Sequence, residues 1–573
     1  MPFLASLVLS IFVGGAPLEV HLHDVASHSA SPALAGASGH IWPSYFELDN
    51  QLFIQAMQDL HATAYRFPGG TVANGYDVLT GLMYPNLRDP TWGIYNERHP
   101  DGLTIPNYVQ LTDTFKNPRQ QFVINCLSVP NADGSGDGVV TATVQEYQTE
   151  ALRLQPFLSN MISEGFNPSY IEFTNELYLP MYNKFEFDKT VEDYENRMNA
   201  FSPMLRSIFP NTPFAAVIPL SEKYRNKAGP DGDLGNLEFW EIDPSIDFQA
   251  IVLHAYVIGT SELKQYIEFN NNSLEDVMTN WMVQTELGLA ASMEYAQNMY
   301  PTKEVWMTEW GILISNIDGE VYEPILRNCT LVSMQAASMF VEMLKYDSIE
   351  IANHHGMVPM LRPIYDENDN LLKFDRTTHG DITAHMNELL SKGPTVLETT
   401  VVNVGEVTAP IVDPNGNGWG THSVSSISAV LVETDDTYHW IGVNRSADDQ
   451  EVALNLGDLN ISAADVQVYQ FYTDALLPKS DPFFETLDLF QPATQETIVL
   501  TLANGMVQHA LPGMGFVDVR ISFAQADANQ DWAINMQDIL SIIGAWGCSD
   551  CQEDIDGSGT VDVGDILTVI AAL

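Results

Sequence analysis

The spacing of apolar and polar positions separates a long central region from the rest of the chain. Between residues 33 and 394, short β-type runs alternate with longer stretches of helical periodicity. Eight strands alternating with helices predict an α/β domain closed as a (β/α)8 TIM barrel rather than an open doubly wound sheet. The runs expected to form its strands are Leu34–Ile41, Ala64–Phe67, Gln121–Leu127, Tyr170–Phe173, Phe214–Ile218, Phe248–Leu253, Glu304–Met307 and Ile349–Asn353.

The pattern changes at about residue 395. From there to residue 523, short runs rich in Val, Thr and Ile are separated by turn-forming clusters, which predicts an all-β sandwich. Residues 17–32 are expected to supply a leading strand of the same sandwich. The catalytic chemistry, if any, is therefore expected in the barrel.

The two ends of the chain carry different signals. Residues 1–16 contain an apolar run that is too short to cross a bilayer and is followed by small residues, which predicts a signal peptide. We therefore expect a secreted or cell-surface protein with no membrane span. Residues 524–573 contain an internal repeat, and each copy places oxygen-bearing residues at the spacing of a Ca²⁺ loop before an apolar helix pattern.

The repeat resembles a dockerin module, because position 12 of each loop is Asp rather than the Glu of an EF-hand. The resemblance implies Ca²⁺ as cofactor and a cohesin-like protein or another cell-surface partner. We expect Cys548 and Cys551 to form a local disulfide rather than half of a zinc site. The expected Ca²⁺ ligands are, in the first loop, Asp527, Asn529, Asp531, Ala533 (through its carbonyl), Asn535 and Asp538, and in the second Asp554, Asp556, Ser558, Thr560 (carbonyl), Asp562 and Asp565.

Composition narrows the possible partners. The chain has 24 Lys and Arg against 75 Asp and Glu, a formal net charge of −51. Such a chain repels nucleic acid and anionic membranes, so we exclude nucleic-acid binding. We interpret the acidity as an adaptation to a salty environment, and it favours a neutral substrate over a polyanionic one.

Two short β-type segments end on glutamates, Ile171–Glu176 and Val305–Glu309. Hydrolysis of a glycosidic bond needs two carboxyl groups, and a TIM barrel places its catalytic groups at the carboxyl ends of its strands. An isolated glutamate at a strand end is usually only solvated. The neighbouring residues decide the matter here.

Asn175-Glu176 on the fourth strand and Glu309 on the seventh resemble the catalytic pattern of clan A glycoside hydrolases. The resemblance implies that Glu176 is the acid/base and Glu309 the nucleophile, and that Asn175 binds the sugar 2-hydroxyl. It also implies a role for the His254-Ala-Tyr256 element, in which Tyr256 hydrogen-bonds Glu309. The structural alternative for His254 is a satisfied core histidine.

Arg66-Phe-Pro-Gly-Gly resembles a segment of α-L-arabinofuranosidases, although Asp77 departs from their pattern. Arg66 is expected to support Glu309 electrostatically, with a buried salt bridge as the alternative. Trp310, Trp92 and Tyr178 are expected to stack on sugar rings, although each could instead be a core residue.

Together these features predict a secreted retaining glycoside hydrolase that cleaves a plant or algal cell-wall polysaccharide without a catalytic cofactor. Agarase-type endo action and arabinofuranosidase-type exo action remain open. The alternative from another class is a catalytically inactive carbohydrate-binding or scaffold protein anchored through the dockerin-like module.

Overall fold

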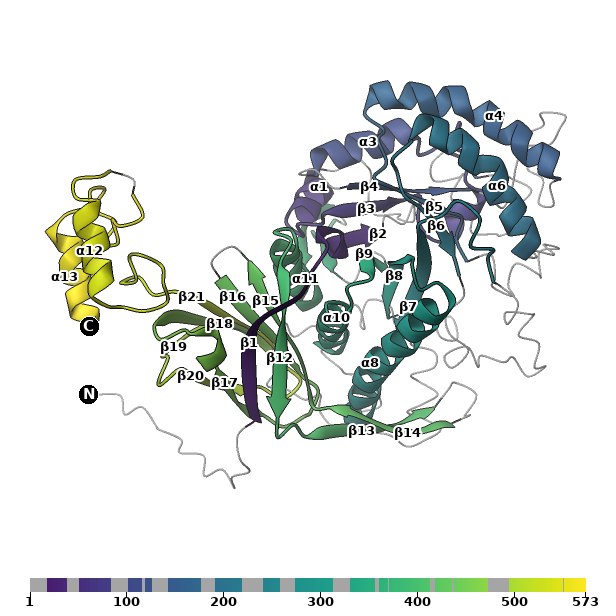
Figure 1. The fold of residues 1–573 in the computed structure, drawn as a ribbon. Coiled ribbons are helices and arrows are strands. Elements are labelled where there is room, and N and C mark those ends of the chain that lie inside the picture. Colours follow the sequence, from purple (N-terminus) through teal and green to yellow (C-terminus); the bar gives the residue numbers. More distant parts are fainter. Residues whose placement is uncertain are drawn as a thin grey trace.

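The central region folds as a barrel of eight parallel strands surrounded by helices (Figure 1). The computed structural model describes residues 18–38, 51–83, 101–115, 119–125, 143–176, 191–218, 241–257, 274–312, 330–355, 360–368, 370–412, 418–434, 437–472, 494–549 and 551–573. The closed order β2 to β9 confirms the predicted TIM barrel. Its strands are β2 (Gly36–Ser38), β3 (Ala64–Phe67), β4 (Arg119–Ile124), β5 (Tyr170–Phe173), β6 (Phe214–Val217), β7 (Ala250–Val257), β8 (Glu304–Ile312) and β9 (Ile349–His355).

Helices follow most of these strands and cover the outside of the barrel. Barrel strands such as β3, β5 and β6 are buried along their whole length, as expected when helices cover the outer face of a parallel sheet. The Tyr194 hydroxyl ties two strand ends together: it donates to the Phe173 carbonyl at 2.8 Å and accepts from the Val217 amide at 2.9 Å. The helices are α1 (Gln51–Gln58), α3 (Ile105–Thr114), α4 (Val144–Met161), α6 (Val191–Ile208), α8 (Leu274–Met299), α10 (Thr330–Met343) and α11 (Thr378–Leu390).

Strands β7 and β8 run further than the apolar pattern predicts. The expected ends were Leu253 and Met307, but β7 continues to Val257 and β8 to Ile312. The two strands stay paired beyond an irregularity that lies between Val252 and His254. Bulges of this kind re-aim side chains beside active sites. The added residues mix polar and apolar side chains and so do not continue the apolar runs that defined the expected strands.

The β-rich region forms one nine-stranded sheet that curls into a sandwich-like shape, in the order β19-β18-β21-β16-β15-β12-β1-β17-β20. His509 of β20 hydrogen-bonds Gln470 of β18 at 2.8 Å, although these strands lie near opposite ends of the order. Strand β1 pairs parallel with β17 and antiparallel with β12. The strands are β1 (Leu18–Ser29), β12 (Thr395–Val402), β15 (Ile427–Thr434), β16 (Thr437–Asn444), β17 (Gln450–Asn455), β18 (Ala464–Tyr472), β19 (Thr494–Leu500), β20 (Met506–Leu511) and β21 (Phe516–Phe523).

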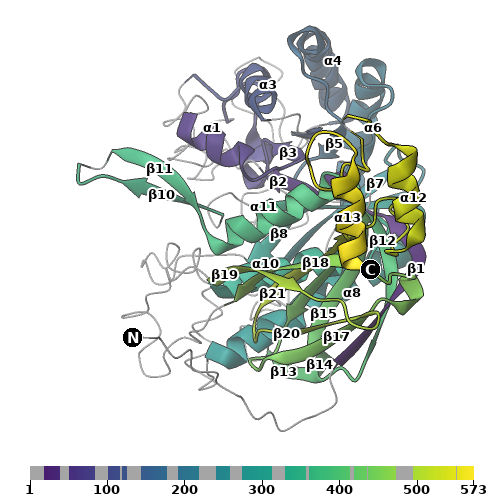
Figure 2. The ribbon, with the colours of Figure 1, turned by 90° about the vertical axis from the view of Figure 1, so that its left-hand side faces the viewer.

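Two hairpins leave these main bodies. Hairpin β13–β14 (Glu406–Val412 and Gly418–Ser425) packs Val407 and Val424 against Val283 of α8. Hairpin β10–β11 (Leu361–Tyr365 and Leu371–Arg376) lies between β9 and α11 in the sequence and projects away from the barrel (Figure 2).

A buried ion-pair network joins the barrel to the sheet. Arg445, which follows β16, is fully buried and donates to Glu342 of α10 and to Glu286 of α8. Across the same interface, His385 of α11 lies 2.8 Å from the buried carboxylate of Asp518. Breaking such a pair leaves an uncompensated buried charge, so these contacts fix how the two bodies pack.

The C-terminal region forms a small module of two helices, α12 (Met536–Gly544) and α13 (Val563–Ala572), which lies beside the sheet (Figure 1). Cys548 and Cys551 form the expected disulfide. Residues 1–16, the expected signal peptide, lie outside the described residues. Within the part of the chain that the structure describes, no helix is long and apolar enough to cross a membrane.

Candidate active site

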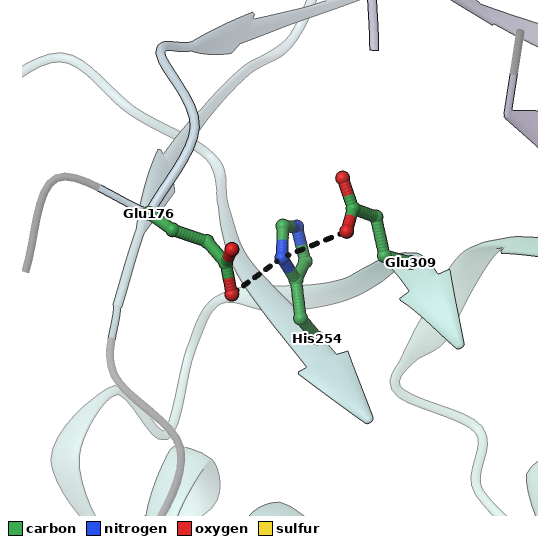
Figure 3. Close-up of side chains that lie close together, drawn as sticks. All are labelled: Glu176, His254 and Glu309. Atoms are coloured by element: carbon green, nitrogen blue, oxygen red, sulfur yellow. Dashed lines mark ion pairs between the residues drawn. The ribbon is translucent and has the colours of Figure 1, made fainter. Parts of the chain in front are cut away.

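Glu176 and Glu309 lie close together at the carboxyl ends of two barrel strands. Glu176 follows β5, the fourth barrel strand, and Glu309 lies in β8, the seventh. His254 of β7 lies between the two carboxylates (Figure 3). One carboxylate oxygen of each glutamate and one ring nitrogen of His254 all lie within 4.8 Å of one another.

The turn that carries Glu176 has an unusual backbone. Thr174 and Glu176 both have positive φ values, 63° and 43°. Asn74, in the 3-10 helix η2 (Thr71–Gly75), holds this turn: its side-chain oxygen accepts from the Asn175 amide at 2.8 Å and its Nδ2 donates to the Asn175 carbonyl at 2.6 Å. Left-handed conformations of non-glycine residues are costly and persist where surrounding contacts fix them.

Arg66 is the central cation of the site and is completely buried. Its Nη1 donates to Glu309 Oε1 at 2.7 Å, while Nε and Nη2 donate to the two oxygens of Glu172 at 2.8 and 2.5 Å. Nη2 also donates to Asn175 Oδ1 at 3.0 Å. Both expected readings of Arg66 hold, because it supports Glu309 and also forms a buried salt bridge with Glu172.

Cationic groups keep Glu309 ionised. Burial alone would raise its pKa, but His254, His355 and Arg66 together hold the pKa well below the usual range of a glutamate. His355 Nδ1 lies 3.1 Å from Glu309 Oε2, and the Tyr256 hydroxyl donates to the same oxygen, as expected. An ionised carboxylate is the form that can act as a nucleophile.

His254 links the two catalytic candidates through charge. Its Nδ1 lies 3.0 Å from Glu176 Oε1 and 3.5 Å from Glu309 Oε2, and its Nε2 contacts the Thr308 hydroxyl at 3.1 Å. Burial lowers the pKa of His254, but the charges of Glu309 and Glu176 outweigh it and raise that pKa. The two carboxylates therefore favour the protonated form of the imidazole between them.

One expected aromatic residue has a different role. Trp310 is only 1% exposed and packs edge-on against Phe340 and His354, with ring centroids 5.0 and 4.7 Å away. It cannot offer a face to a sugar, so the prediction of stacking at Trp310 is wrong. Because β8 extends past Glu309, the residue after the glutamate points into the core rather than into the cleft. Trp92 and Tyr178 lie outside the described residues.

The structure adds residues that the sequence analysis missed. Glu172 pairs with Arg66, Asn74 holds the Glu176 turn, and His355 contacts Glu309. Glu172 carried a signal, since it is a charge inside a four-residue strand whose other residues are uncharged. The contacts of Asn74 and His355 join distant parts of the chain and leave no local pattern. The amide Nδ2 of Asn175 is buried and has no hydrogen-bond partner among the described residues.

The C-terminal loops form a second candidate site, suited to a cation. Carboxylate oxygens of Asp554, Asp556 and Asp565 lie within 4.8 Å of one another. In the first loop, Trp532 occupies the position of Gly559 and shares its left-handed backbone, with φ values of 65° and 91°. Its ring packs on Phe523 with centroids 4.0 Å apart, which ties the module to the sheet.

Comparison with known proteins identifies the fold. No family model and no curated protein matches the chain. The structure of an α-L-arabinofuranosidase from Thermotoga maritima, in an arabinose complex, matches at a TM-score of 0.59 and 13% identity, covering 88% of this chain and 100% of that one. A family 51 α-L-arabinofuranosidase from Bifidobacterium longum matches at 0.62 and 14%, with the same coverage. The protein BuGH86 in complex with neoagarooctaose matches at 0.55 and 12%, covering 88% and 78%. The chain thus shares the TIM-barrel fold of these proteins.

Proposed function

We propose that this protein is a retaining glycoside hydrolase in which Glu309 is the nucleophile and Glu176 the acid/base. The observation that carries the proposal is the approach of the two carboxylates, with oxygens within 4.8 Å of each other around His254. Retaining enzymes hold their carboxyl groups about 5–5.5 Å apart, whereas inverting enzymes need roughly 6.5–9.5 Å to admit a water.

The environments of the two glutamates suit different roles. Glu309 is buried and surrounded by Arg66, His254 and His355, so it is ionised and can attack the anomeric carbon. Glu176 is more exposed, with 17% of its side chain accessible, and can protonate the departing oxygen. It then deprotonates the water that releases the glycosyl-enzyme.

The proposed substrate is a neutral polysaccharide of plant or algal cell walls. The fold neighbours include enzymes named as α-L-arabinofuranosidases and a protein solved with neoagarooctaose, which support arabinose-containing and agar-type glycans respectively. The net charge of −51 disfavours sulfated chains. Digestion of arabinan, arabinoxylan and agarose, followed by product sizing, separates exo release of arabinose from endo cleavage.

The C-terminal module is proposed to bind Ca²⁺ and to attach the enzyme to a protein partner outside the cell. The carboxylates of Asp554, Asp556 and Asp565 fit a hard cation with oxygen ligands, which supports Ca²⁺ in the second loop. Exposed apolar side chains on both helices, such as Leu540 and Leu567, support a docking role. A cohesin-like partner and secretion through residues 1–16 complete the proposal.

Two substitutions test the assignment of roles. Glu309→Gln should lower hydrolysis of every substrate by about 10³-fold or more, because the covalent step is lost. Glu176→Ala should abolish polysaccharide cleavage but retain the first step on aryl glycosides, whose leaving groups need no proton. Azide should then accelerate turnover and give a glycosyl azide of retained configuration.

The matched control is Glu150→Gln, which removes a buried carboxylate of α4 that pairs with Arg153. Full activity in both Glu309→Gln and Glu176→Ala would contradict the enzyme assignment. A wild-type protein that binds polysaccharides without cleaving any would instead support the scaffold alternative.

A further inference from the structure

A third glutamate of the barrel, Glu172, is buried beside the proposed active site and has no part in the proposed chemistry. It lies in β5, four positions before Glu176, and is 0% exposed. Its carboxylate accepts from Arg66 and, at 3.4 Å each, from Gln121 Nε2 and the Thr308 hydroxyl. A buried carboxylate costs free energy unless it is paired, and Arg66 provides the pairing for Glu172. What this pair does for the neighbouring Glu309 then requires explanation.

The guanidinium of Arg66 is shared between two carboxylates. Glu172 occupies its Nε and Nη2 at 2.8 and 2.5 Å, whereas Glu309 receives only Nη1, at 2.7 Å. The guanidinium is planar and its donors form a fixed fork, so the two-point contact with Glu172 sets the plane of the group and the direction of Nη1. Without Glu172, Nη2 keeps only its 3.0 Å contact with Asn175 Oδ1, and the fork can turn to pair with Glu309 through two donors.

We propose that Glu172 is a positioning residue that divides the charge of Arg66, so that Glu309 receives one directed hydrogen bond rather than a full bidentate ion pair. The inference rests on the proposed role of Glu309 as nucleophile. A carboxylate locked into a bidentate guanidinium pair is less basic and a weaker nucleophile. Arg66, His254 and His355 keep Glu309 ionised, and Glu172 keeps the ionised carboxylate basic enough to react.

The groups that face Glu309 all bear on its titration. They come from barrel strands β3, β7 and β9 and from the turn after β5, and His254 in turn contacts Glu176. Removing the negative charge of Glu172 favours the ionised form of Glu309, and a fuller pairing with Arg66 acts in the same direction. The facing groups are Arg66 of β3, Glu176 after β5, His254 and Tyr256 of β7, and His355 of β9.

The test is Glu172→Gln in the full chain, with Glu172→Asp as the charge-retaining variant. In Glu172→Gln we expect kcat to fall about 10²-fold with little change in KM, the loss typical of a displaced electrostatic contact. The acidic limb of the kcat/KM profile should move down by about one pH unit. In Glu172→Asp, the acidic limb should return most of the way to its wild-type pH. Glu150→Gln is the matched control, because Glu150 accepts from Arg153 Nε and Nη2 in the same two-point manner at 2.5 and 2.6 Å, and it should move neither quantity.

A second readout does not depend on a substrate. Carbon-13 NMR titration of glutamate carboxyls, with the Glu309 signal assigned by its loss in Glu309→Gln, should show Glu309 titrating at lower pH in Glu172→Gln than in the wild type. An unchanged titration overturns the inference, even if stability falls. A shifted titration in a protein that cleaves no glycan supports the inference about Arg66 while contradicting the proposed function.

Arg66→Lys keeps the inference falsifiable if Glu172→Gln does not fold. Lysine keeps the charge but cannot bridge two carboxylates as a rigid fork. Wild-type kcat and an unchanged Glu309 titration in Arg66→Lys would show that the divided fork is not needed. A loss of kcat with a moved titration is the expected result.

Discussion

The carboxylate of Glu309 is contacted by three basic side chains, each from a different barrel strand: Arg66, His254 and His355. Their combined charge outweighs the effect of burial on Glu309 and holds its pKa low. His254 also lies 3.0 Å from Glu176. Two chemically identical carboxyl groups therefore receive different environments, which is what acid/base and nucleophile roles require.

A buried histidine near the site should make stability depend on pH. His379 of α11 is 0% exposed, neither ring nitrogen has a hydrogen-bond partner among the described residues, and burial holds its pKa well below the usual value. In the unfolded chain a histidine titrates near pH 6.5, so on acidification the unfolded state takes up this proton first. Stability is complete above about pH 6.5 and should fall by up to about 1.4 kcal/mol per pH unit below it, until the folded-state pKa is reached.

Replacing His379 by Leu should remove this slope. Urea unfolding between pH 7 and pH 5 measures it, and the wild-type curve should be steeper than that of His379→Leu. His28→Leu, which changes a partly exposed histidine of β1, is the control and should keep the wild-type slope. Parallel curves for wild type and His379→Leu would show that this histidine does not contribute.

Individual residues were predictable from sequence where the strand position alone decides what they contact. Glu176, Glu309, Arg66 and Tyr256 end or extend parallel barrel strands, whose carboxyl ends must meet at one face. Trp310 was mispredicted because side-chain direction depends on how far β8 continues, and the expected strand ended at Met307. Glu172 was missed because its partner lies on another strand.

At the scale of elements, alternation of strands and helices was enough to predict the barrel, because each parallel pair needs a crossover. The β-rich region was harder. Its strands were recognisable, but the parallel pairing of β1 with β17 joins residues from opposite ends of the chain. No local sequence pattern predicts which residues of these two strands pair. The packing of hairpin β13–β14 on α8 likewise depends on tertiary contacts.

The two loops of the C-terminal module should bind Ca²⁺ independently. Each loop has a capping box in which Asp538 or Asp565 accepts from the residue at the helix N-cap, so the ligand geometry is partly preformed. Asp556→Ala in the second loop and Asn529→Ala in the matching position of the first should each reduce the stoichiometry from two to one by titration calorimetry. Excess Ca²⁺ at about 100 times Kd should stabilise the module by roughly 2.7 kcal/mol per site.

Chelation provides the corresponding control. EDTA should lower the melting temperature of the module while leaving hydrolysis by the barrel unchanged, because no residue of the proposed catalytic pair lies in these loops. Binding of no Ca²⁺ by the wild-type protein would contradict the assignment of the module. Loss of hydrolysis on chelation would contradict the separation of the two sites.

At the scale of the whole molecule, charge acts on two levels. Buried pairs such as Arg445 with Glu342 join the barrel to the sheet and are shielded from solvent ions. The surplus of acidic residues, with a formal net charge of −51, instead acts across the surface through mutual repulsion. Salt should therefore change the stability of the fold mainly through the surface charges, leaving the interface pairs largely intact.

The measurable consequence is a melting temperature that rises with ionic strength. Between about 0.02 and 0.5 M salt the Debye length falls from more than 20 Å to less than 5 Å, so repulsion between exposed carboxylates is removed over this range. We expect a rise of several degrees that is equal for NaCl and choline chloride, because screening depends on ionic strength and not on the identity of the cation. Sucrose, which adds no ions, should leave the difference between low and high salt unchanged. A melting temperature that falls with salt would show that attractive surface pairs dominate, since these are what screening weakens.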